Sequence, residues 1–375
     1  MRSLQHPRFC LFLLLSAILL TASAAAQPSF TPGRPWPDTA GNPVQSHLGG
    51  LLFENGVYYW YGMDFRGPRI APDTLPHQSF AWLLNLGVTV YSSTDLVTWK
   101  PAPSQLTEIT YKPGGLLQPA NLLVRPKVIK DHATGKFILM AALTAPDFES
   151  VSDVVYAVAD QPLGPFRWMG KLGWCGKPNA AGLWAGVWEQ AKSDAPERIR
   201  GFDMTLYTDG DGKSFLLTAH TRILAYELGA GSTCASHVEV MQGATGEAPA
   251  LFKDRGTYYL LTSQLTGWAP NRNQSFTSPS IHGPWTPRGP FAHGPGEETT
   301  FDGQTTFVLP VQGKPHAFIF MADRFGAVSD TDIPDFTRAT HIWLPIEIDA
   351  ARHTLTVNWR DTWDLSAFAA SSEKQ

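Results

Sequence analysis

The chain has 375 residues, of which 43% are hydrophobic and 17% are charged, with 33 Asp and Glu against 29 Lys and Arg. This length allows one large all-β domain or two domains of ordinary size. A mildly acidic chain without a basic stripe is a poor partner for nucleic acid or an anionic membrane, so these two classes of partner are excluded.

The first 26 residues predict a secretory signal peptide. Arg2 and Arg8 precede the apolar run FCLFLLLSAILL, and the small residues of TASAAA follow before Gln27. The apolar run is too short to predict a membrane span, and Cys10 lies inside it, so a lipid anchor is not expected. Removal of the two arginines changes the formal charge from −4 to −6. We expect a soluble, monomeric protein in the periplasm or outside the cell.

Two cysteines remain after residue 26, Cys175 in GWCGKPN and Cys234 in GSTCASH. An oxidising compartment would allow them to pair, but spacing along the chain cannot show that they are close, so both the paired and the free state stay open. No group of Cys and His has the spacing of a zinc site. We therefore predict no metal and no cofactor, and we leave open a Ca²⁺ or Na⁺ ion in a channel.

Five short runs recur along the chain, each a glycine-containing turn followed by β-branched, aromatic and aliphatic residues. They lie at residues 54–63, 133–143, 210–220, 254–264 and 311–323, and further aromatic elements follow at 90–100, 164–170 and 282–289. Repetition at intervals of several tens of residues is typical of radially arranged four-stranded blades. The pattern predicts a five-bladed β-propeller, all-β, formed by residues 27–375 as a single domain.

The strand YYWYG is apolar on both of its faces. Tyr58 and Trp60 point to one side, and Tyr59 and Tyr61 point to the other. A sheet with one solvated face would not tolerate this pattern, whereas blades that cover each other would. A two-sheet sandwich with a jelly-roll partner is the competing architecture. The long insertion at residues 172–201 is expected to cover one rim of the site.

Three stretches place polar groups at the entrances of apolar strands: RGFDMTLYTDGDG, TGEAPALF and TTFDGQTTFVLP. Because the inner strands of a propeller converge, we expect Asp203, Glu247 and Gln304 to meet at one mouth of the channel. Asp209 and Asp211 alternate as in some calcium loops, but the spaced oxygen ligands of such a loop do not follow. These two residues are interpreted as a hairpin turn.

The segments VRPKVIKDHATGKF, DMTLYTDGDGKSFLL, EAPALFKDRGTYYLLTS, TGWAPN and TTFDGQTTFVLP resemble glycoside hydrolase family 43, in particular its exo-β-1,3-galactanase branch. The segments DTAGNPVQSHLGGLLFENGVYYWYG, YSSTDLVTW and HIWLPIEI agree with the same branch near the two ends. The resemblance covers nearly all of the chain after residue 26, in order. It implies an inverting glycoside hydrolase that removes terminal sugars from galactan or arabinogalactan-type side chains.

The resemblance also implies roles for three residues: Glu247 as general acid, Asp203 as the carboxylate that orients this acid and tunes its pKa, and Gln304 as the group that faces the hydrolytic water. Partial burial beside a negative charge raises the pKa of a glutamate and keeps its proton available. The proline at position 249 biases Ala248 toward extended geometry. Inversion requires room for one water, with catalytic groups separated by about 6.5–9.5 Å.

Two positions depart from the galactanase branch, where glutamates are common at the sites of Met63 and Val124. The loss of both carboxylates is expected to cost several kcal/mol of affinity for a galactose with hydroxyls there, so the sugar could differ. Met63 and Val124 would then form an apolar floor for the substrate, or Asp64 would take over one role. Asp147 and Phe148 are weak candidates for a further element that the branch carries.

Four other residues are candidates for substrate binding. Trp268 could stack on a sugar face or pack within a blade, and Asn271 could bond a sugar hydroxyl or hold its own loop. Thr266 lies in the same loop, and His47 could line the channel and contact substrate or an ion. The leading interpretation is a cofactor-free hydrolase acting on a poly- or oligosaccharide. The alternative is a glycan-binding propeller that has lost turnover.

Overall fold

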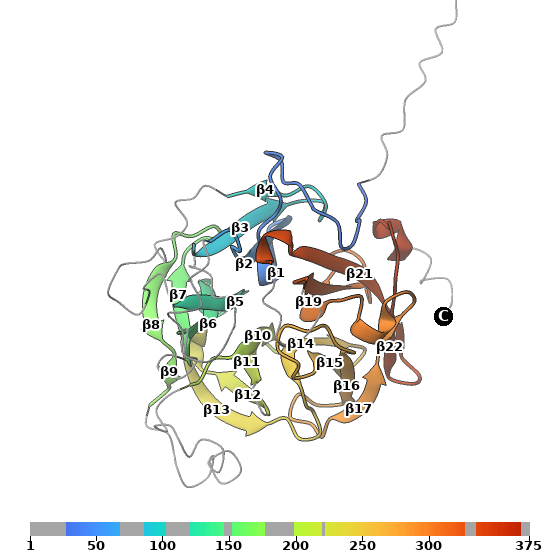
Figure 1. Cartoon of the computed structure of the whole chain (residues 1–375). Helices are drawn as coiled ribbons and strands as arrows, with labels where there is room; N and C mark the ends of the chain where they lie inside the picture. The colour runs from blue at the N-terminus through green and yellow to red at the C-terminus, as the bar shows by residue number, and fades with distance from the viewer. Residues whose placement is uncertain are drawn as a thin grey trace, which may run out of the picture.

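The computed structural model describes residues 28–67, 86–102, 117, 121–145, 152–176, 199–219, 222–326 and 335–368. These residues form five sheets of four or five strands arranged around a central axis (Figure 1). The predicted five-bladed β-propeller is confirmed, and the two-sheet sandwich is excluded. The predicted signal peptide, Asp147 and Phe148 lie outside the described residues, as does most of the insertion at 172–201.

Each blade begins with an innermost strand at the axis. These strands are β1 (His47–Glu54), β5 (Leu122–Lys130), β10 (Asp203–Thr208), β14 (Glu247–Asp254) and β19 (Gln304–Pro310). They contact one another in a closed ring, β1 with β5, β5 with β10, β10 with β14, β14 with β19, and β19 with β1. Hydrogen bonds join residues near the starts of different inner strands, Arg125 to Gln304, Ala248 to Asp203 and Gln304 to Glu247, so these starts lie at the same mouth of the channel.

Each of the five glycine-containing units forms a turn and a strand, as predicted, and the structure shows that this strand is the second of its blade: β2 (Val57–Met63), β6 (Phe137–Thr144), β11 (Ser214–Ala219), β15 (Thr257–Ser263) and β20 (Phe318–Arg324). The third strands are β3 (Val88–Ser93), β7 (Ser152–Ala159), β12 (Ile223–Leu228), β16 (Gln274–Ser278) and β21 (Thr340–Asp349). The fourth strands are β4 (Lys100–Pro101), β8 (Arg167–Lys171), β13 (Cys234–Val240), β17 (Thr286–Pro290) and β22 (Thr354–Asn358).

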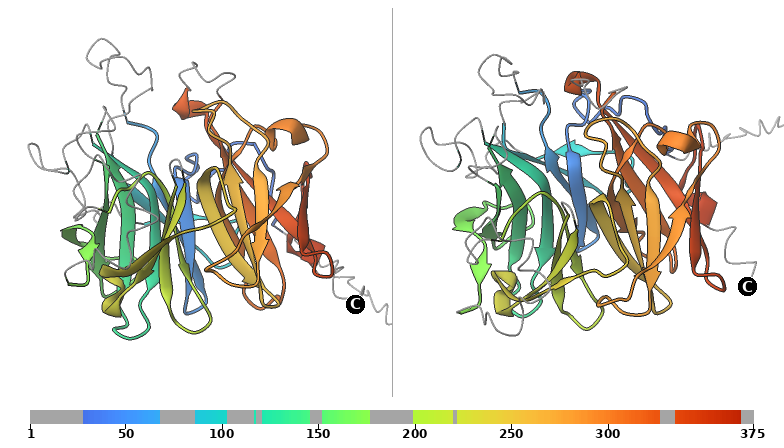
Figure 2. Two further views of the ribbon diagram at one scale, coloured as in Figure 1. Left: turned by 90° about the horizontal axis from the view of Figure 1, so that it is seen from below. Right: turned by 60° about the horizontal axis from the view of Figure 1, so that its bottom comes forward.

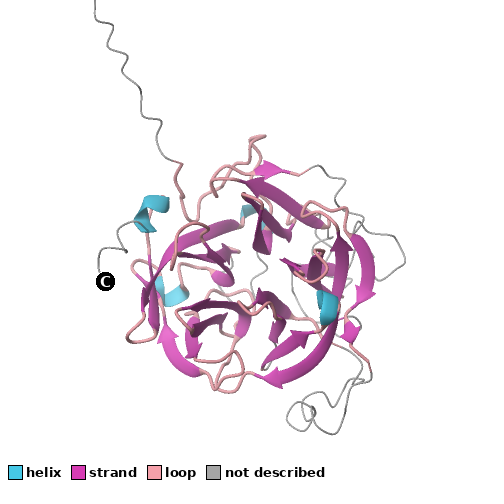
Figure 3. Cartoon of the chain, turned by 180° about the vertical axis from the view of Figure 1, so that it is seen from behind, coloured by secondary structure: helices cyan, strands magenta, loops and turns pink. Residues whose placement is uncertain are grey.

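Two short strands, β9 (Gly173–Trp174) and β18 (Ala292–His293), add a parallel fifth strand to the outer edge of the third and fifth blades. Single-turn 3₁₀ helices lie in the connections: η3 (Ala230–Ser232), η4 (Glu297–Thr299), η5 (Phe336–Arg338) and η6 (Leu365–Phe368). Figure 3 shows these short helices lying between the strands of the sheets. Among the described residues, no helix has the length and apolar character needed to cross a membrane.

The first blade explains why its second strand, β2, can be apolar on both faces. Tyr58 and Trp60 are buried in the core shared with the fifth and fourth blades, whereas Tyr61 is buried with residues of the second blade and Tyr59 packs against that same cluster. The blades therefore pack face to face, as expected from YYWYG. Figure 2 shows the sheets edge on, standing side by side around the axis.

The two ends of the described chain are held together. Phe30 and Trp363 exchange backbone hydrogen bonds of 2.7 and 3.1 Å, and their rings stack with centroids 4.2 Å apart. Cys175, directly after β9, is bonded to Cys234 at the start of β13. The sequence left this pairing open, and the structure shows that β9 brings the two residues together by pairing with β13.

Candidate active site

The three polar residues expected to meet do so at the mouth where the inner strands begin. Asp203, Glu247 and Gln304 are the first residues of β10, β14 and β19. The Gln304 Nε2 atom donates to Glu247 Oε1 at 3.1 Å, and Asp203 Oδ2 accepts from the backbone N–H of Ala248 at 2.9 Å. Asp203 therefore holds the residue that follows the acid.

Pro249 led us to expect an extended backbone at Ala248, next to the acid. The structure shows a different conformation. Ala248 has φ 53° and lies in a register irregularity between Glu247 and Ala250. The capture of its N–H by Asp203 supports this left-handed conformation. A β-bulge of this kind redirects a side chain at the edge of a sheet, and here it brings Glu247 toward Gln304.

Burial and charge together make Glu247 a proton donor. Burial, and after it the negative charge of Asp203, raise the pKa of Glu247 from 4.5 to about 8. The positive charge of Arg125 and hydrogen bonds from Ser263 and Gln304 oppose this increase. The balance leaves the carboxyl mostly protonated at neutral pH, as an acid catalyst requires.

A further polar residue, Arg125 on β5, was not among the candidates. It is 1% exposed, and its guanidinium contacts two other inner strands. Nε donates to Asp203 Oδ1 at 2.5 Å, Nη2 donates to Gln304 Oε1 at 2.6 Å, and Nη1 donates to the Thr305 carbonyl at 3.3 Å. The parallel between VRP and EAP could have identified Arg125, because both motifs lie near the start of an inner strand and in both the residue before proline has a left-handed backbone conformation.

Glu247 and Gln304 are closer together than we expected for inversion. Glu247 and Gln304 are in direct hydrogen-bond contact, instead of being separated by the width of a sugar and a water. Substrate has to break this hydrogen bond to lie between the two side chains.

The two apolar replacements do not form a substrate floor together. Met63 is 2% exposed and packs in an apolar cluster that includes Phe65 and Phe336, so the prediction that it contacts substrate is not met. Val124 is partly exposed and packs against two core clusters. The buried Asp64 cannot take over a missing role, because its carboxylate is held by Arg66 through bonds of 2.6 to 3.2 Å.

The loop after β15 is braced by the residues proposed to bind sugar. Asn271 donates to the Gln264 carbonyl and to Thr266 Oγ1, and its Oδ1 accepts from the Gln264 N–H. The hydroxyl of Thr266 donates in turn to the Ala269 carbonyl. Trp268 is partly exposed and packs edge-on against the rings of the Phe325–Phe336 pair. Asn271 and Thr266 therefore hold the conformation of the loop, and Trp268 packs against aromatic residues outside it.

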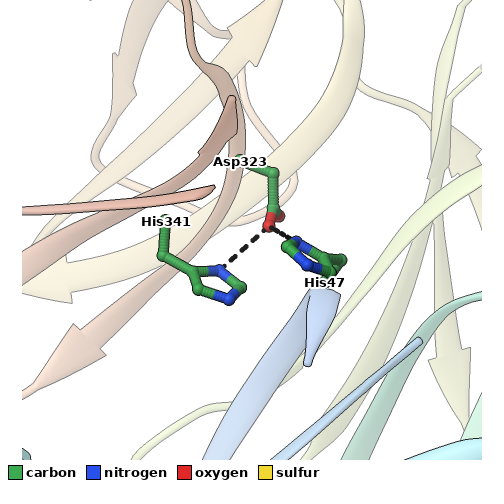
Figure 4. A group of neighbouring side chains, drawn as sticks. All are labelled: His47, Asp323 and His341. Carbon is green, nitrogen blue, oxygen red and sulfur yellow. Dashed lines mark hydrogen bonds and ion pairs between the residues drawn. The ribbon is translucent and has the colours of Figure 1, made fainter. Parts of the chain in front are cut away.

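His47, the first residue of β1, is fully buried, so its imidazole does not line an open channel, as the sequence had suggested it could. Its Nδ1 is 2.9 Å from Asp323 Oδ1, and the Nδ1 of His341 is 3.1 Å from the same oxygen (Figure 4). Burial, followed by the nearby His341, lowers the pKa of His47 to about 4. Hydrogen bonds from both imidazoles hold the pKa of Asp323 well below its usual range despite burial.

The His47–Asp323–His341 group also has the composition of a metal site, because one potential ligand atom from each residue lies within 4.8 Å of the others. The carboxylate, however, is already satisfied by protein donors. Its second oxygen accepts from the Leu48 N–H at 2.9 Å and from Thr306 Oγ1 at 2.6 Å. Protein donors therefore engage both oxygens of Asp323.

A β-propeller whose channel mouth holds a protonated glutamic acid beside a carboxylate has the groups required for acid-assisted cleavage of a glycosidic bond. Residues 74–350 match the profile of the Glycosyl hydrolases family 43, and the chain belongs to this family. Comparison with curated protein sequences found no match.

Solved structures agree with this family. A family 43 β-1,3-galactosidase is 27% identical, with a TM-score of 0.74 over 92% of this chain and 65% of its own, so this chain spans less than two thirds of that protein. A second family 43 β-1,3-galactosidase, solved with galactodeoxynojirimycin, is 28% identical, with a TM-score of 0.73 over 90% of this chain and 100% of its own. The exo-β-1,3-galactanase of Phanerochaete chrysosporium, with β-1,3-galactotriose, is 26% identical, with a TM-score of 0.70 over 90% and 68%.

Proposed function

We propose that this chain is an exported, exo-acting glycoside hydrolase that removes terminal galactose from β-1,3-linked galactan or arabinogalactan side chains. The observation that carries the proposal is the buried Glu247, whose pKa is raised to about 8 beside Asp203. The similarity to β-1,3-galactosidases and an exo-β-1,3-galactanase supports the sugar and the linkage. Family 43 membership supports the reaction class.

In the proposed mechanism, Glu247 donates its proton to the glycosidic oxygen as the bond to the anomeric carbon breaks. Asp203 keeps the acid in place through the Ala248 N–H and disfavours its early ionisation. The new carboxylate is then stabilised by the positive charge of Arg125 and by the hydrogen bond from Ser263. These are interactions that strengthen as charge develops on the acid.

Gln304 is proposed to position the attacking water once substrate has separated it from Glu247. Its Oε1 has two lone pairs, and one of them accepts from Arg125. The other remains to accept a hydrogen bond from water. Because a neutral amide is a weak base, we expect the water oxygen to bond first to the oxocarbenium-like carbon, and the protonated hydroxyl that results then releases its extra proton to solvent water.

Export is proposed from two features. The N-terminal 26 residues have the composition of a cleavable signal peptide. The Cys175–Cys234 disulfide is of the kind that persists in the periplasm or outside the cell.

The test is release of sugar from β-1,3-galactan, arabinogalactan, and arabinofuranosyl and xylosyl substrates by the wild type and by Glu247→Gln. Release of galactose that collapses in the variant supports the proposal, and ¹H NMR of the first product formed identifies its anomer. An α-anomer from a β-linked substrate supports inversion, whereas a β-anomer refutes it. Glycan binding without turnover in the wild type would instead favour the binding-propeller alternative.

A further inference from the structure

Arg125 occupies an unusual place for an arginine. It is the fourth residue of β5, the inner strand of the second blade, has φ 54° although it is not glycine, and lies in a register irregularity between Val124 and Lys127. Its side chain is 2% exposed and reaches across the channel mouth to β10 and β19. A left-handed non-glycine residue is costly and persists where the surrounding contacts require it.

We infer that Arg125 is a positioning residue that fixes the direction in which the Gln304 carboxamide faces and ties it to the acid. This inference rests on the proposed hydrolase function. The contacts place one guanidinium between the residue that holds the backbone beside the acid, Asp203, and the residue on the water side, Gln304.

The direction of the amide follows from the chemistry of its neighbour. A guanidinium has only donors, so the group of Gln304 that lies 2.6 Å from Nη2 has to be its oxygen. The amide nitrogen is then directed toward Glu247 Oε1 at 3.1 Å and Ser263 Oγ at 3.2 Å. If the amide were flipped, two donors would face each other at Arg125. Without Arg125, this preference is lost.

The same guanidinium determines which donor each carboxylate oxygen of Asp203 accepts from. Arg125 Nε donates a hydrogen bond to Asp203 Oδ1, so Oδ2 remains to accept a hydrogen bond from the Ala248 N–H. A lysine could supply the charge, but a single ammonium group lacks the planar fork that reaches two partners in a fixed geometry. Charge and geometry can therefore be separated by substitution.

The experiment compares Arg125→Met, Arg125→Lys and the matched control Arg324→Met. Arg324 is a half-buried arginine whose Nε and Nη2 both donate to the carbonyl of Phe301, outside the Asp203–Glu247–Gln304 group. For each protein, kcat, KM, the pH dependence of kcat/KM and thermal stability are measured on the glycan that the wild type cleaves.

We expect Arg125→Met to lower kcat by roughly 10²–10³-fold with a much smaller change in KM, because positioning acts mainly in the transition state. Loss of the positive charge should also move the basic limb of the pH profile to higher pH, since Arg125 lowers the pKa of Glu247. Arg125→Lys should restore the basic limb but not kcat. In the Arg324→Met control, the basic limb of the pH profile should lie at the same pH as in the wild type.

Two results would overturn the inference. The first is that kcat falls no further in Arg125→Met and Arg125→Lys than in the control Arg324→Met. The second is that Arg125→Lys has the same kcat as the wild type. If Arg125→Met does not fold, Arg125→Lys and rescue of Arg125→Ala by added guanidinium give the same decision. Titration of Glu247 by ¹³C NMR does not depend on turnover. An inactive wild type would therefore refute the proposed function. Separately, a changed Glu247 pKa in Arg125→Lys would refute the argument that the positive charge at position 125 sets this pKa.

Discussion

The acid role of Glu247 can be tested through the leaving group of the substrate. With a pKa of about 8, roughly 90% of Glu247 is protonated at pH 7, whereas roughly 0.3% would be at the ordinary value of 4.5. The environment thus increases the population of the active form roughly 300-fold. Glu247→Gln removes the transferable proton but keeps the size of the side chain.

Removal of a general acid costs roughly 10²–10⁴-fold in rate when the leaving group must be protonated. We therefore expect Glu247→Gln to lose this much kcat/KM on a glycan and less than about tenfold on a dinitrophenyl glycoside, whose phenolate leaves without a proton. The assay is initial rates on both substrates between pH 5 and 10. The wild type should lose kcat/KM on the glycan as pH rises through about 8, because Glu247 then ionises, and the variant should show no such limb.

Equal losses on the two substrates, or a basic limb near pH 8 that persists in Glu247→Gln, would refute the reasoning. Gln304→Asn is the matched comparison, because it shortens the neighbouring side chain without changing any charge. We expect its loss to be similar on the two substrates, since positioning of the water does not depend on the leaving group.

The remaining predictions concern stability. Because burial lowers the pKa of His47 to about 4, the unfolded chain binds this proton more tightly, and the free energy of unfolding should fall by about 3 kcal/mol as pH falls from 6.5 to 4. Urea denaturation at several pH values measures this slope, which His47→Asn should reduce. Met63→Glu should destabilise the protein by about 3 kcal/mol or more, because the carboxylate would be unpaired in an apolar cluster. Tighter galactose binding at unchanged stability would contradict this result. Reduction of the bond between Cys175 and Cys234, separated by 59 residues, should cost about 4 kcal/mol, seen as a lower urea midpoint in Cys234→Ser.

The architecture was predictable because its signals are local. Each blade repeats a glycine turn and a strand, and the alternation of Tyr58 to Tyr61 depends only on the two-residue period of a strand. Asp203, Glu247 and Gln304 were found for a similar reason. Each is a polar residue at the entrance of an apolar strand, and the convergence of inner strands brings such entrances together.

The rest of the site depends on contacts that are remote in sequence. The conformation of Ala248 departs from the usual preference before proline, and its N–H bonds to Asp203, 45 residues away. His47 is buried because its carboxylate partner, Asp323, lies 276 residues away on the neighbouring blade. Met63 was assigned to the substrate side, but the aromatic residues that cover it come from other loops. Single-residue patterns carry no information about these distant partners.

The charges at the channel mouth explain why an arginine is compatible with an acid that must stay protonated. Asp203 and Arg125 form a pair of opposite charges, so Glu247 and Gln304 both lie beside a site that has no net charge. Burial and Asp203 raise the pKa of Glu247, and Arg125 limits this increase. Without that limit the acid would hold its proton too strongly to donate it, because acid catalysis is most efficient when the pKa lies near the working pH. The fork of Arg125 therefore serves the proton transfer and the orientation of Gln304 through the same bonds.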